Sequence, residues 1–321
     1  MAALNPAGAL AQLLEKDGTG ISWADLTFNP WIGCQKVGPA CEHCYAETLD
    51  NRWYARRGEP SHWGPGAPRK RTSIGNWTKP LRWQRIAAAA GVSLRVFCAS
   101  LADWADNAVD PQWRADLAVM IHQTPNLRWM LLTKRIKNAG ALLRLMFPEG
   151  VPPNVCLGIT VVTQEEVDRD LPKAIAIKKA LGISRLFLSM EPLLGPIEFD
   201  PAMLAEVDLV IAGGESGTDA RPVNPYWARA IRDACAALGV AFHWKQWGEW
   251  KPFDWLPDGT FLHLTLSAPA NGPKTMGIWP DGHVGYGTAD EHGGRGVSIT
   301  RVGTDKAGRM LDGREHLDQL P

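Results

Sequence analysis

Apolar, β-branched and aromatic residues gather in short runs that recur along the chain at intervals of roughly 30 residues, the length of one βα unit. These runs begin at Leu94, Arg128, Val155, Arg185, Asp208 and Val240. An earlier alternating stretch, Ile21 to Phe28, predicts a first strand. Near-continuous apolar character is typical of parallel strands that are covered on both faces. The pattern therefore predicts a parallel sheet built from repeated βα units.

Helix start and stop signals separate the runs. Asp and Pro open an amphipathic helix at residues 110–123, Thr163 with Glu166 makes a capping-box pattern, and Asn-Pro and Gly bound residues 224–239. No glycine-rich dinucleotide fingerprint follows the first strand. We therefore predict an α/β protein with a TIM-type parallel β/α barrel, partial or full, in preference to a doubly wound sheet.

The two ends of the chain lack this rhythm. Residues 1–20 carry a short apolar helix at 9–14 and are expected to form an N-terminal arm. Residues 21–250 hold the barrel. Residues 251–321, in which Gly, Pro and Trp are frequent, predict a small irregular extension with β-hairpin pieces and a polar tail.

Charge and hydropathy narrow the class of protein. The 34 basic and 34 acidic residues cancel, so no overall field attracts nucleic acid or membrane. The sequence shows neither a signal peptide nor eighteen consecutive apolar residues, which predicts a cytoplasmic protein with no membrane contact. The fifteen tryptophans, many beside Arg or Pro, are expected to offer stacking surfaces.

Three of the six cysteines form the spacing Cys34-x6-Cys41-x2-Cys44 in a loop marked by Gly and Pro. Thiolates this close suit an iron–sulfur cluster or zinc. Tetrahedral zinc needs a fourth ligand, such as His43, whereas a 4Fe–4S cluster on three thiolates leaves one iron open. Ordinary buried thiols are the structural alternative for this loop, and the other three cysteines are expected to lie in the core.

Polar residues follow most of the predicted strands. The relevant segments are Ser100-Leu101-Ala102-Asp103, Thr133-Lys134-Arg135, Ser189-Met190-Glu191-Pro192, Gly213-Gly214-Glu215-Ser216 and Lys245-Gln246-Trp247-Gly248-Glu249. In a parallel barrel these ends converge on the face that carries the chemistry. We predict Asp103, Glu191 and Lys245 as catalytic residues, although any βα turn needs polar caps and Lys245 could instead pair with a glutamate.

Residues 51–85 combine cations with aromatic side chains and contain one acid, Glu59. Such a mixture suits a nucleic-acid strand, because cations neutralise phosphates and aromatic rings stack on bases. A solvated basic face is the alternative. The predicted substrate or nucleic-acid contacts, which include two residues outside this segment, are Arg56, Arg57, Trp63, Arg69, Arg71, Arg135 and Trp247.

Six motifs occur in order along the chain: the three-cysteine loop, LLTKR at 131–135, SMEPLLGPI at 189–197, GGESG at 213–217, KQWGEW at 245–250 and GRMLDGR at 308–314. Together they resemble a phage-associated, three-cysteine, radical-SAM-like family of unassigned function, distantly similar to spore photoproduct lyase. The resemblance implies a TIM-type barrel with a 4Fe–4S cluster on Cys34, Cys41 and Cys44. It also implies location in the host cytoplasm if the gene is phage-borne.

The same resemblance implies S-adenosylmethionine as cofactor, cleaved reductively to a 5′-deoxyadenosyl radical that abstracts hydrogen from a substrate. The cofactor-binding residues it suggests are His43, Tyr45, Ser100, Lys134, Glu191, Gly213, Gly214 and Glu215. A reductase or other electron donor is then required. Two features depart from the wider superfamily: its usual spacing is C-x3-C-x2-C, and its Gly-Gly-Glu follows the second strand.

Three functions follow for test. The first is a radical SAM enzyme that acts on a nucleic acid or nucleotide in modification or repair. The second is a zinc or iron–sulfur protein that binds nucleic acid without radical chemistry. The third is a metal-bound barrel that acts mainly with a protein partner. The sequence names neither the substrate nor the oligomeric state.

Overall fold

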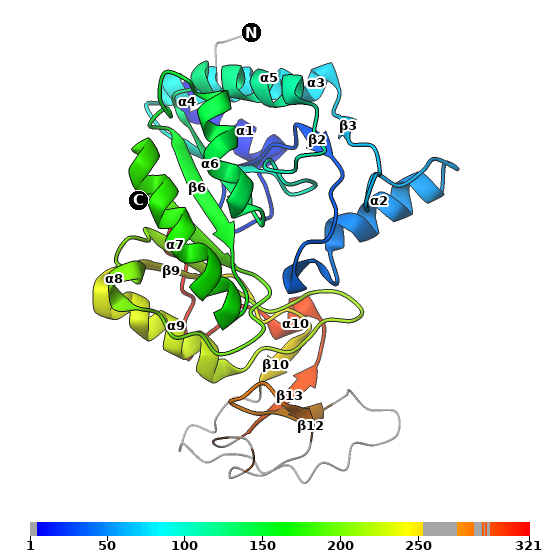
Figure 1. Ribbon diagram of the computed structural model, residues 1–321, viewed down its shortest axis with the longest axis vertical. Helices are drawn as coiled ribbons and strands as arrows, with labels where there is room; N and C mark the ends of the chain where they lie inside the picture. Colours follow the sequence, from blue (N-terminus) through cyan, green and yellow to red (C-terminus); the bar gives the residue numbers. More distant parts are fainter. Residues whose placement is uncertain (1–4, 253–274, 286–290, 292, 294–295) are drawn as a thin grey trace. The chain divides into compact units, whose positions relative to one another are not determined.

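The computed structural model describes residues 5–252, 275–285, 291, 293 and 296–321. Its largest sheet has seven strands in the order β1-β4-β5-β6-β7-β8-β9 (Figure 1). The strands are β1 (Leu26–Thr27), β4 (Leu94–Cys98), β5 (Leu127–Thr133), β6 (Val155–Thr160), β7 (Arg185–Met190), β8 (Leu209–Ala212) and β9 (Ala241–Trp244). The pairs β1–β4, β4–β5, β5–β6 and β8–β9 are parallel. This sheet confirms the expected α/β class and the partial form of the TIM-type barrel.

Helices connect successive strands, as the spacing of the apolar runs predicts. They are α4 (Lys79–Ala90), α5 (Pro111–His122), α6 (Ile136–Met146), α7 (Gln164–Leu181), α8 (Pro201–Leu204) and α9 (Pro225–Leu238). The end signals of α9 are confirmed, because Asn224 accepts from the amide of Tyr226 at 2.9 Å and Gly239 adopts φ 68°.

Two compact units make up the chain. The first comprises Met1–Thr160 with Asp170–Phe187, and the second comprises Val161–Arg169 with Leu188–Pro321. The first unit also holds the short elements α1 (Pro6–Asp17), β2 (Trp31–Ile32), η1 (Pro39–Cys41), α2 (Tyr45–Ala55), β3 (Lys70–Arg71) and α3 (Ile74–Trp77). Within this unit α2 projects away from the strands (Figure 1).

Tryptophans fill the core of the first unit. Phe28 meets Trp77, Trp83 and Trp129 edge to face, at ring distances of 5.5, 6.5 and 5.6 Å. Trp77 and Trp83 were expected to offer stacking surfaces for a nucleic-acid strand, but they are 8% and 1% exposed. That expectation is wrong for these two residues, because burial of an indole removes a large apolar area from water and each N–H finds an acceptor.

The first strand is shorter than the predicted Ile21–Phe28. Residues 21–24 form a turn in which the amide of Ala24 donates to the carbonyl of Ile21 at 3.1 Å. This turn places the ring of Trp23 4.6 Å from that of Phe97. Aromatic packing therefore replaces strand pairing over half of the predicted strand.

The predicted N-terminal arm contains a packed helix. Leu13 of α1 is 2% exposed, and Asp17 accepts hydrogen bonds from Arg82 and from the indole of Trp83. Helix α1 therefore packs against α4.

The second unit contains a small antiparallel sheet of order β10-β13-β11-β12. Its strands are β10 (Trp250–Pro252), β11 (Thr275–Ile278), β12 (Val284–Gly285) and β13 (Val297–Arg301), followed by α10 (Thr304–Ala307). These strands lie in the expected C-terminal extension, and residues 253–274 of that extension lie outside the described residues.

The C-terminal residues of the second unit run along β9. His243 and Leu317 form an antiparallel bridge, and the amide of Trp244 donates to the carbonyl of His316 at 2.8 Å. The tail therefore supplies hydrogen-bonding partners to a strand at the end of the seven-stranded sheet.

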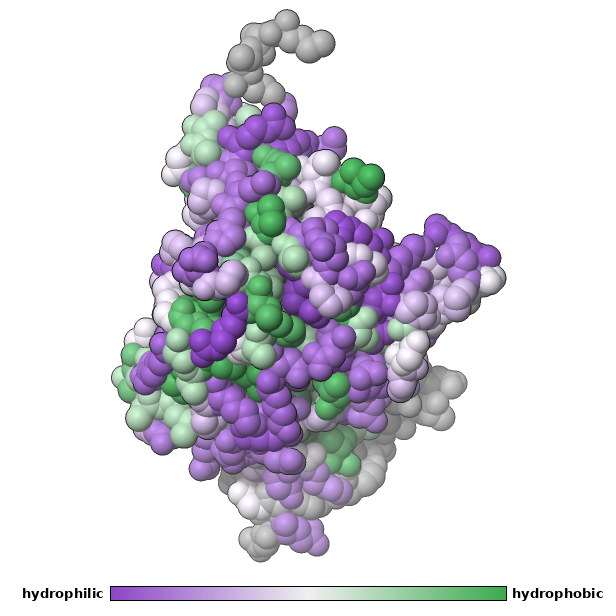
Figure 2. All heavy atoms as spheres, turned by 45° about the horizontal axis from the view of Figure 1, so that its top comes forward, coloured by the Kyte–Doolittle hydropathy of each residue, from purple (hydrophilic) through white to green (hydrophobic). Residues whose placement is uncertain are grey.

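The surface is mainly polar. The face in Figure 2 is largely hydrophilic, with scattered apolar residues. Among the described helices, none combines the length and the apolar character needed to cross a bilayer.

Candidate functional site

The cysteine loop of the first unit begins at a glycine that no other residue could replace without strain. Gly33 has φ 110°, and a β-carbon there would lie 2.5 Å from the carbonyl oxygen of His62. Just before it, β2 pairs with β3. After it, Cys34 bridges to Trp63 in parallel fashion. The loop is therefore held against residues 62–63 on one side.

The three thiols occupy different parts of this loop. Cys34 lies beside the bridge, Cys41 ends η1 and is 8% exposed, and Cys44 is the N-cap of α2. All six cysteines of the chain are free thiols. Burial raises the pKa of Cys34 to about 11, and nearby Asp103 adds to this shift while Arg135 opposes it. Burial also raises the pKa of Cys44, against the amides at the start of α2.

The thiols fit an iron–sulfur cluster by donor type. Among the described residues, no three His, Cys, Asp or Glu side chains are gathered so that they could hold one metal ion. Ligands of a single zinc ion must all lie at about 2.3 Å from one centre when they are sulfurs. In a 4Fe–4S cluster each cysteine binds a different iron, so the sulfurs stand farther apart. The arrangement of the loop thus favours a cluster over a single ion.

A buried network joins the cysteine loop to the ends of β4 and β5. The Arg135 Nη1 donates to Cys34 Sγ at 3.3 Å and to Asp103 Oδ2 at 2.9 Å, and its Nη2 donates to the Gln35 carbonyl at 2.8 Å. Asp103 also accepts from the hydroxyl of Thr133 at 2.7 Å and from the amide of Lys134 at 2.9 Å. The side chains of Arg135 and Asp103 are only 8% and 7% exposed. Asp103 is therefore the anchor of this network.

The electrostatics of the network favour a permanently charged arginine. Burial alone would lower the pKa of Arg135, but Asp103, Cys34 and Asp106 together raise it. The guanidinium is the cation that faces the Cys34 sulfur. A negative charge on that sulfur would be compensated at close range.

The structure brings Tyr45, Ser100 and Asn29 together beside the loop. The hydroxyl of Tyr45 donates to the Ser100 carbonyl at 2.9 Å, and Asn29 Nδ2 donates to Ser100 Oγ at 3.0 Å. Lys134 Nζ lies 3.4 Å from Thr160 Oγ1 in the same unit. The predicted roles of Tyr45, Ser100, Lys134 and His43 in cofactor binding stay predictions.

Several cations of residues 51–85 are paired with acids. Arg69 is buried and donates to Asp106 Oδ2 at 2.8 Å, while Arg71 lies 2.6 Å from Asp116 and 4.2 Å from the Trp77 ring. Such pairs stabilise the fold and lower the charge available to a polyanion.

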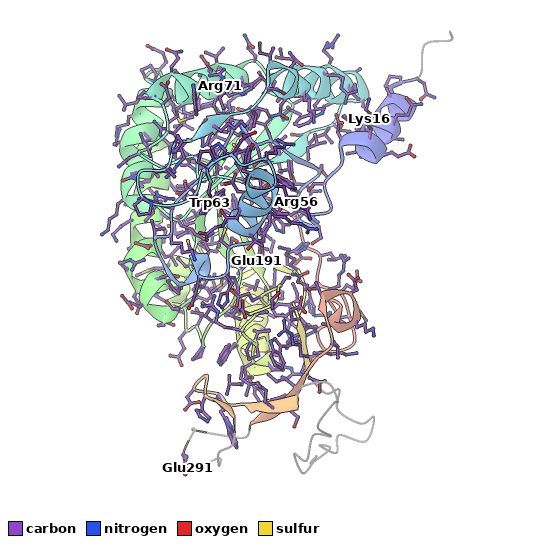
Figure 3. The ribbon with its side chains drawn as sticks, turned by 90° about the vertical axis from the view of Figure 1, so that its right-hand side faces the viewer. Lys16, Arg56, Trp63, Arg71, Glu191 and Glu291 are labelled. Atoms are coloured by element: carbon purple, nitrogen blue, oxygen red, sulfur yellow. The ribbon has the colours of Figure 1, made fainter. Side chains whose placement is uncertain are left out.

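The other predicted substrate contacts in this segment are more accessible. Arg56 and Arg57 are exposed at the C-terminal end of α2, and Trp63 is half-buried beside Cys34. Figure 3 shows that Arg71 lies apart from Arg56 and Trp63. The four predicted contacts, Arg56, Arg57, Trp63 and Arg71, therefore do not form one cluster.

In the second unit, the ends of β7 and β9 meet through an ion pair. Lys245 Nζ donates to Glu191 Oε2 at 3.2 Å, and these side chains are 31% and 15% exposed. Glu191 Oε1 is buried without a hydrogen-bonding partner, and a β-carbon on Gly213 would lie 3.2 Å from it. The ion pair anticipated as the alternative for Lys245 is thus present. The predicted catalytic roles of both residues stay predictions.

The Gly-Gly-Glu segment packs against the loop after β9. A β-carbon on Gly214 would lie 2.0 Å from the Trp247 carbonyl oxygen, so only glycine allows this approach. The carboxylate of Glu215 accepts from Arg221 Nε at 2.8 Å and from Arg221 Nη2 at 2.6 Å. Trp247 is 4% exposed and donates to the Met310 carbonyl at 2.8 Å. These contacts give Glu215 and Trp247 structural partners, and their predicted ligand contacts stay predictions.

Three residues of these networks were missed at the sequence level. Thr133 and Asn29 end predicted strands, so the polar residue after an apolar run was an available signal. Arg221 carried no such signal, because its partnership with Glu215 depends on a turn between them.

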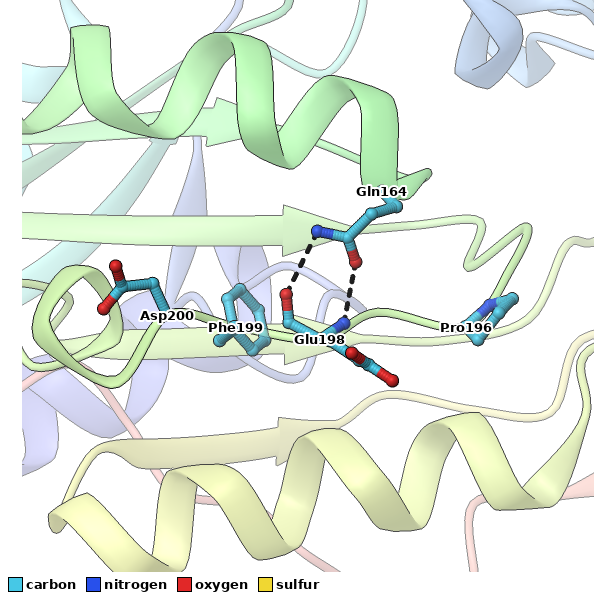
Figure 4. Close-up of a pocket in the computed structure, with 5 residues that line it drawn as sticks. All are labelled: Gln164, Pro196, Glu198, Phe199 and Asp200. Atoms are coloured by element: carbon cyan, nitrogen blue, oxygen red, sulfur yellow. Dashed lines mark hydrogen bonds between the residues drawn. The ribbon is translucent and has the colours of Figure 1, made fainter.

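A pocket of about 500 Å³ lies elsewhere in the second unit (Figure 4). It is lined by Gln164, Pro196, Glu198, Phe199 and Asp200. The Gln164 amide is occupied by the backbone of Glu198, at 3.0 and 2.7 Å. None of these five residues belongs to the predicted site.

Two solved structures are distantly similar to the chain. One is a mutant of spore photoproduct lyase with bound AdoMet and dinucleoside spore photoproduct, at 13% identity and a TM-score of 0.40, with 76% of this chain and 68% of that chain covered. The other is a candidate alpha-L-fucosidase from Bacteroides thetaiotaomicron VPI-5482, at 10% identity and a TM-score of 0.33, with 68% and 72% covered. Both are weak matches.

Family membership is better defined. A search of curated proteins found no match. The model of a family described as a protein of unknown function, DUF5131, matches residues 18–321, which include the cysteine loop and both units. The chain therefore belongs to the DUF5131 family.

Proposed function

We propose that this protein is an iron–sulfur enzyme of the radical SAM type, in which Cys34, Cys41 and Cys44 hold a 4Fe–4S cluster. The observation that carries the proposal is the set of three free thiols on one loop after the first strand of a parallel sheet. Bound with such a cluster, S-adenosylmethionine supplies radical chemistry for hydrogen abstraction from a substrate. An external electron donor completes the system.

The residues around the thiols suit this task. Cys44 caps α2, whose first amides stabilise negative charge on its sulfur. Cys41 is buried, which limits the access of water to its sulfur. Three thiolates add negative charge, and Arg135 offers one buried cation beside Cys34.

Anaerobic reconstitution tests the proposal. Purified protein is incubated with iron and sulfide, assayed for iron and labile sulfide, then reduced in the presence of S-adenosylmethionine. We expect about four irons and four sulfides per chain, as a 4Fe–4S cluster requires, and release of 5′-deoxyadenosine and methionine. Uncoupled cleavage gives this readout without a substrate.

The cysteine series supplies the controls. Cys34→Ala, Cys41→Ala and Cys44→Ala should each lose iron and cleavage with the fold retained, whereas Cys235→Ala, a buried thiol in α9, should keep both. Wild-type protein that holds no iron at these thiols contradicts the proposal. Binding of zinc alone, with unfolding of each loop variant, would support a structural metal site instead.

The exposed end of α2 supports a nucleic-acid substrate. Arg56 and Arg57 are exposed there, Trp53 is 44% exposed, and the same helix begins at Cys44. Cations beside an exposed indole suit phosphates and stacked bases. The same observation favours the second candidate, a metal-containing nucleic-acid-binding protein without radical chemistry.

Binding to single-stranded oligonucleotides tests this substrate class. The variant Arg56→Glu/Arg57→Glu should weaken binding at least tenfold at low salt and reduce the salt dependence by about two counterions. Arg71→Glu, which changes a paired cation on β3, is the matched control. Equal binding by both variants would exclude α2 as the nucleic-acid contact.

A further inference from the structure

The guanidinium of Arg135 is directed at the cysteine loop and is enclosed on all sides that bind. Its Nη1 contacts Cys34 Sγ and Asp103 Oδ2, and its Nη2 contacts the carbonyl of Gln35. The side chain is 8% exposed. A group so fully used inside the fold has little surface left for a substrate phosphate.

The backbone around Arg135 fixes its direction. The amide of Arg135 donates to Thr133 Oγ1 at 2.8 Å, and the Thr133 hydroxyl donates to Asp103 Oδ1 at 2.7 Å. Asp103 also accepts from the amide of Ala105 at 2.9 Å, which ties it to its own loop. The carboxylate therefore orients the guanidinium from the side opposite to Cys34.

We infer that Arg135, oriented by Asp103, is a positioning residue that holds the cysteine loop at Cys34 and Gln35 and donates an N–H···S hydrogen bond to the first cluster ligand. This inference rests on the proposed function for its cluster. Hydrogen bonds to ligand sulfurs favour the reduced, more negative cluster and are a known determinant of cluster potential. Arg135 thus raises the reduction potential of the cluster.

Two variants and a control separate this role from general stabilisation. Arg135→Gln removes the charge and the fork, and Arg135→Lys keeps the charge but cannot donate in the same paired geometry. Lys137→Gln removes a positive charge two residues later, from the exposed surface of α6. Each reconstituted protein is titrated by EPR for its midpoint potential. Each apo protein is examined by hydrogen–deuterium exchange across residues 33–44.

We expect a more negative potential and faster exchange in Arg135→Gln, partial recovery of the potential in Arg135→Lys, and wild-type values in Lys137→Gln. A wild-type potential in Arg135→Gln would overturn the inference and leave the proposed function intact. A wild-type protein that takes up no cluster would overturn the proposed function and the effect on potential together. The exchange data on the apo proteins would then decide whether Arg135 holds the loop, and unchanged exchange would overturn that part.

Discussion

Lys245 Nζ lies 3.2 Å from Glu191 Oε2, and the two residues come directly after β9 and β7. Backbone hydrogen bonds hold both positions, because the amide of Lys245 donates to the Ala212 carbonyl at 2.9 Å and that of Gly213 to the Met190 carbonyl at 3.3 Å. The ion pair is consequently fixed by the ends of three successive strands of the sheet.

A double-mutant cycle should detect this pair. Lys245→Gln, Glu191→Gln and the double variant are compared by urea unfolding, and we expect a coupling free energy of about 0.5–2 kcal/mol. The partial exposure of Lys245 keeps the value below that of a fully buried pair. Strictly additive effects would show that the pair does not contribute to stability.

Gly214 is required by a close backbone approach. Gly214→Ala should lower the free energy of unfolding by about 1–3 kcal/mol, because its β-carbon would lie 2.0 Å from the Trp247 carbonyl oxygen. Gly195→Ala is the matched control, since no atom lies within 4 Å of a β-carbon there. Chemical denaturation of both variants checks the difference, and equal stability would argue against the approach.

Asp103→Asn should be among the most destabilising single changes in the first unit. It leaves the guanidinium of Arg135 buried without a charged partner, and loss of one member of a buried pair costs about 3–5 kcal/mol. Asp116→Asn removes the partner of Arg71 in a pair that is about one-third exposed, with an expected cost of about 0–1 kcal/mol. Thermal and urea unfolding compare the two. Similar losses would contradict the burial of the Asp103 network.

Acid should destabilise the second unit through His243. This residue is fully buried on β9, and burial lowers its pKa below the ordinary value of about 6.5. The unfolded chain then binds more protons than the folded one as pH falls through and below 6.5. The stabilisation is therefore complete above that pH and declines below it, by at most about 1.4 kcal/mol per pH unit.

Urea unfolding between pH 7.5 and 5.5 measures this dependence. His243→Asn should reduce the slope, while His122→Asn, at an exposed position on α5, should leave it unchanged. Burial likewise lowers the pKa of His316, so part of the slope should persist in His243→Asn. A wild-type slope in His243→Asn would contradict the assignment.

The sequence by itself determined the succession of strands and helices, because each depends on local residue patterns. Six apolar runs beginning at positions 94 to 240 correspond to β4 to β9 within one residue. The ends of α9 follow from Asn224 and Gly239, whose side-chain and backbone preferences act within a few residues. The three-cysteine spacing was equally visible, since it lies within a single loop.

Only the tertiary structure decided which side chains meet. Arg135 faces Cys34 across about a hundred residues of sequence, Glu215 is bound by Arg221, and two tryptophans of the basic segment surround Phe28. No local pattern specifies such partners, because a cation or an indole of given sequence context can face water, an acid or the core. Burial against particular neighbours makes that choice, and it depends on how the whole sheet and its loops pack.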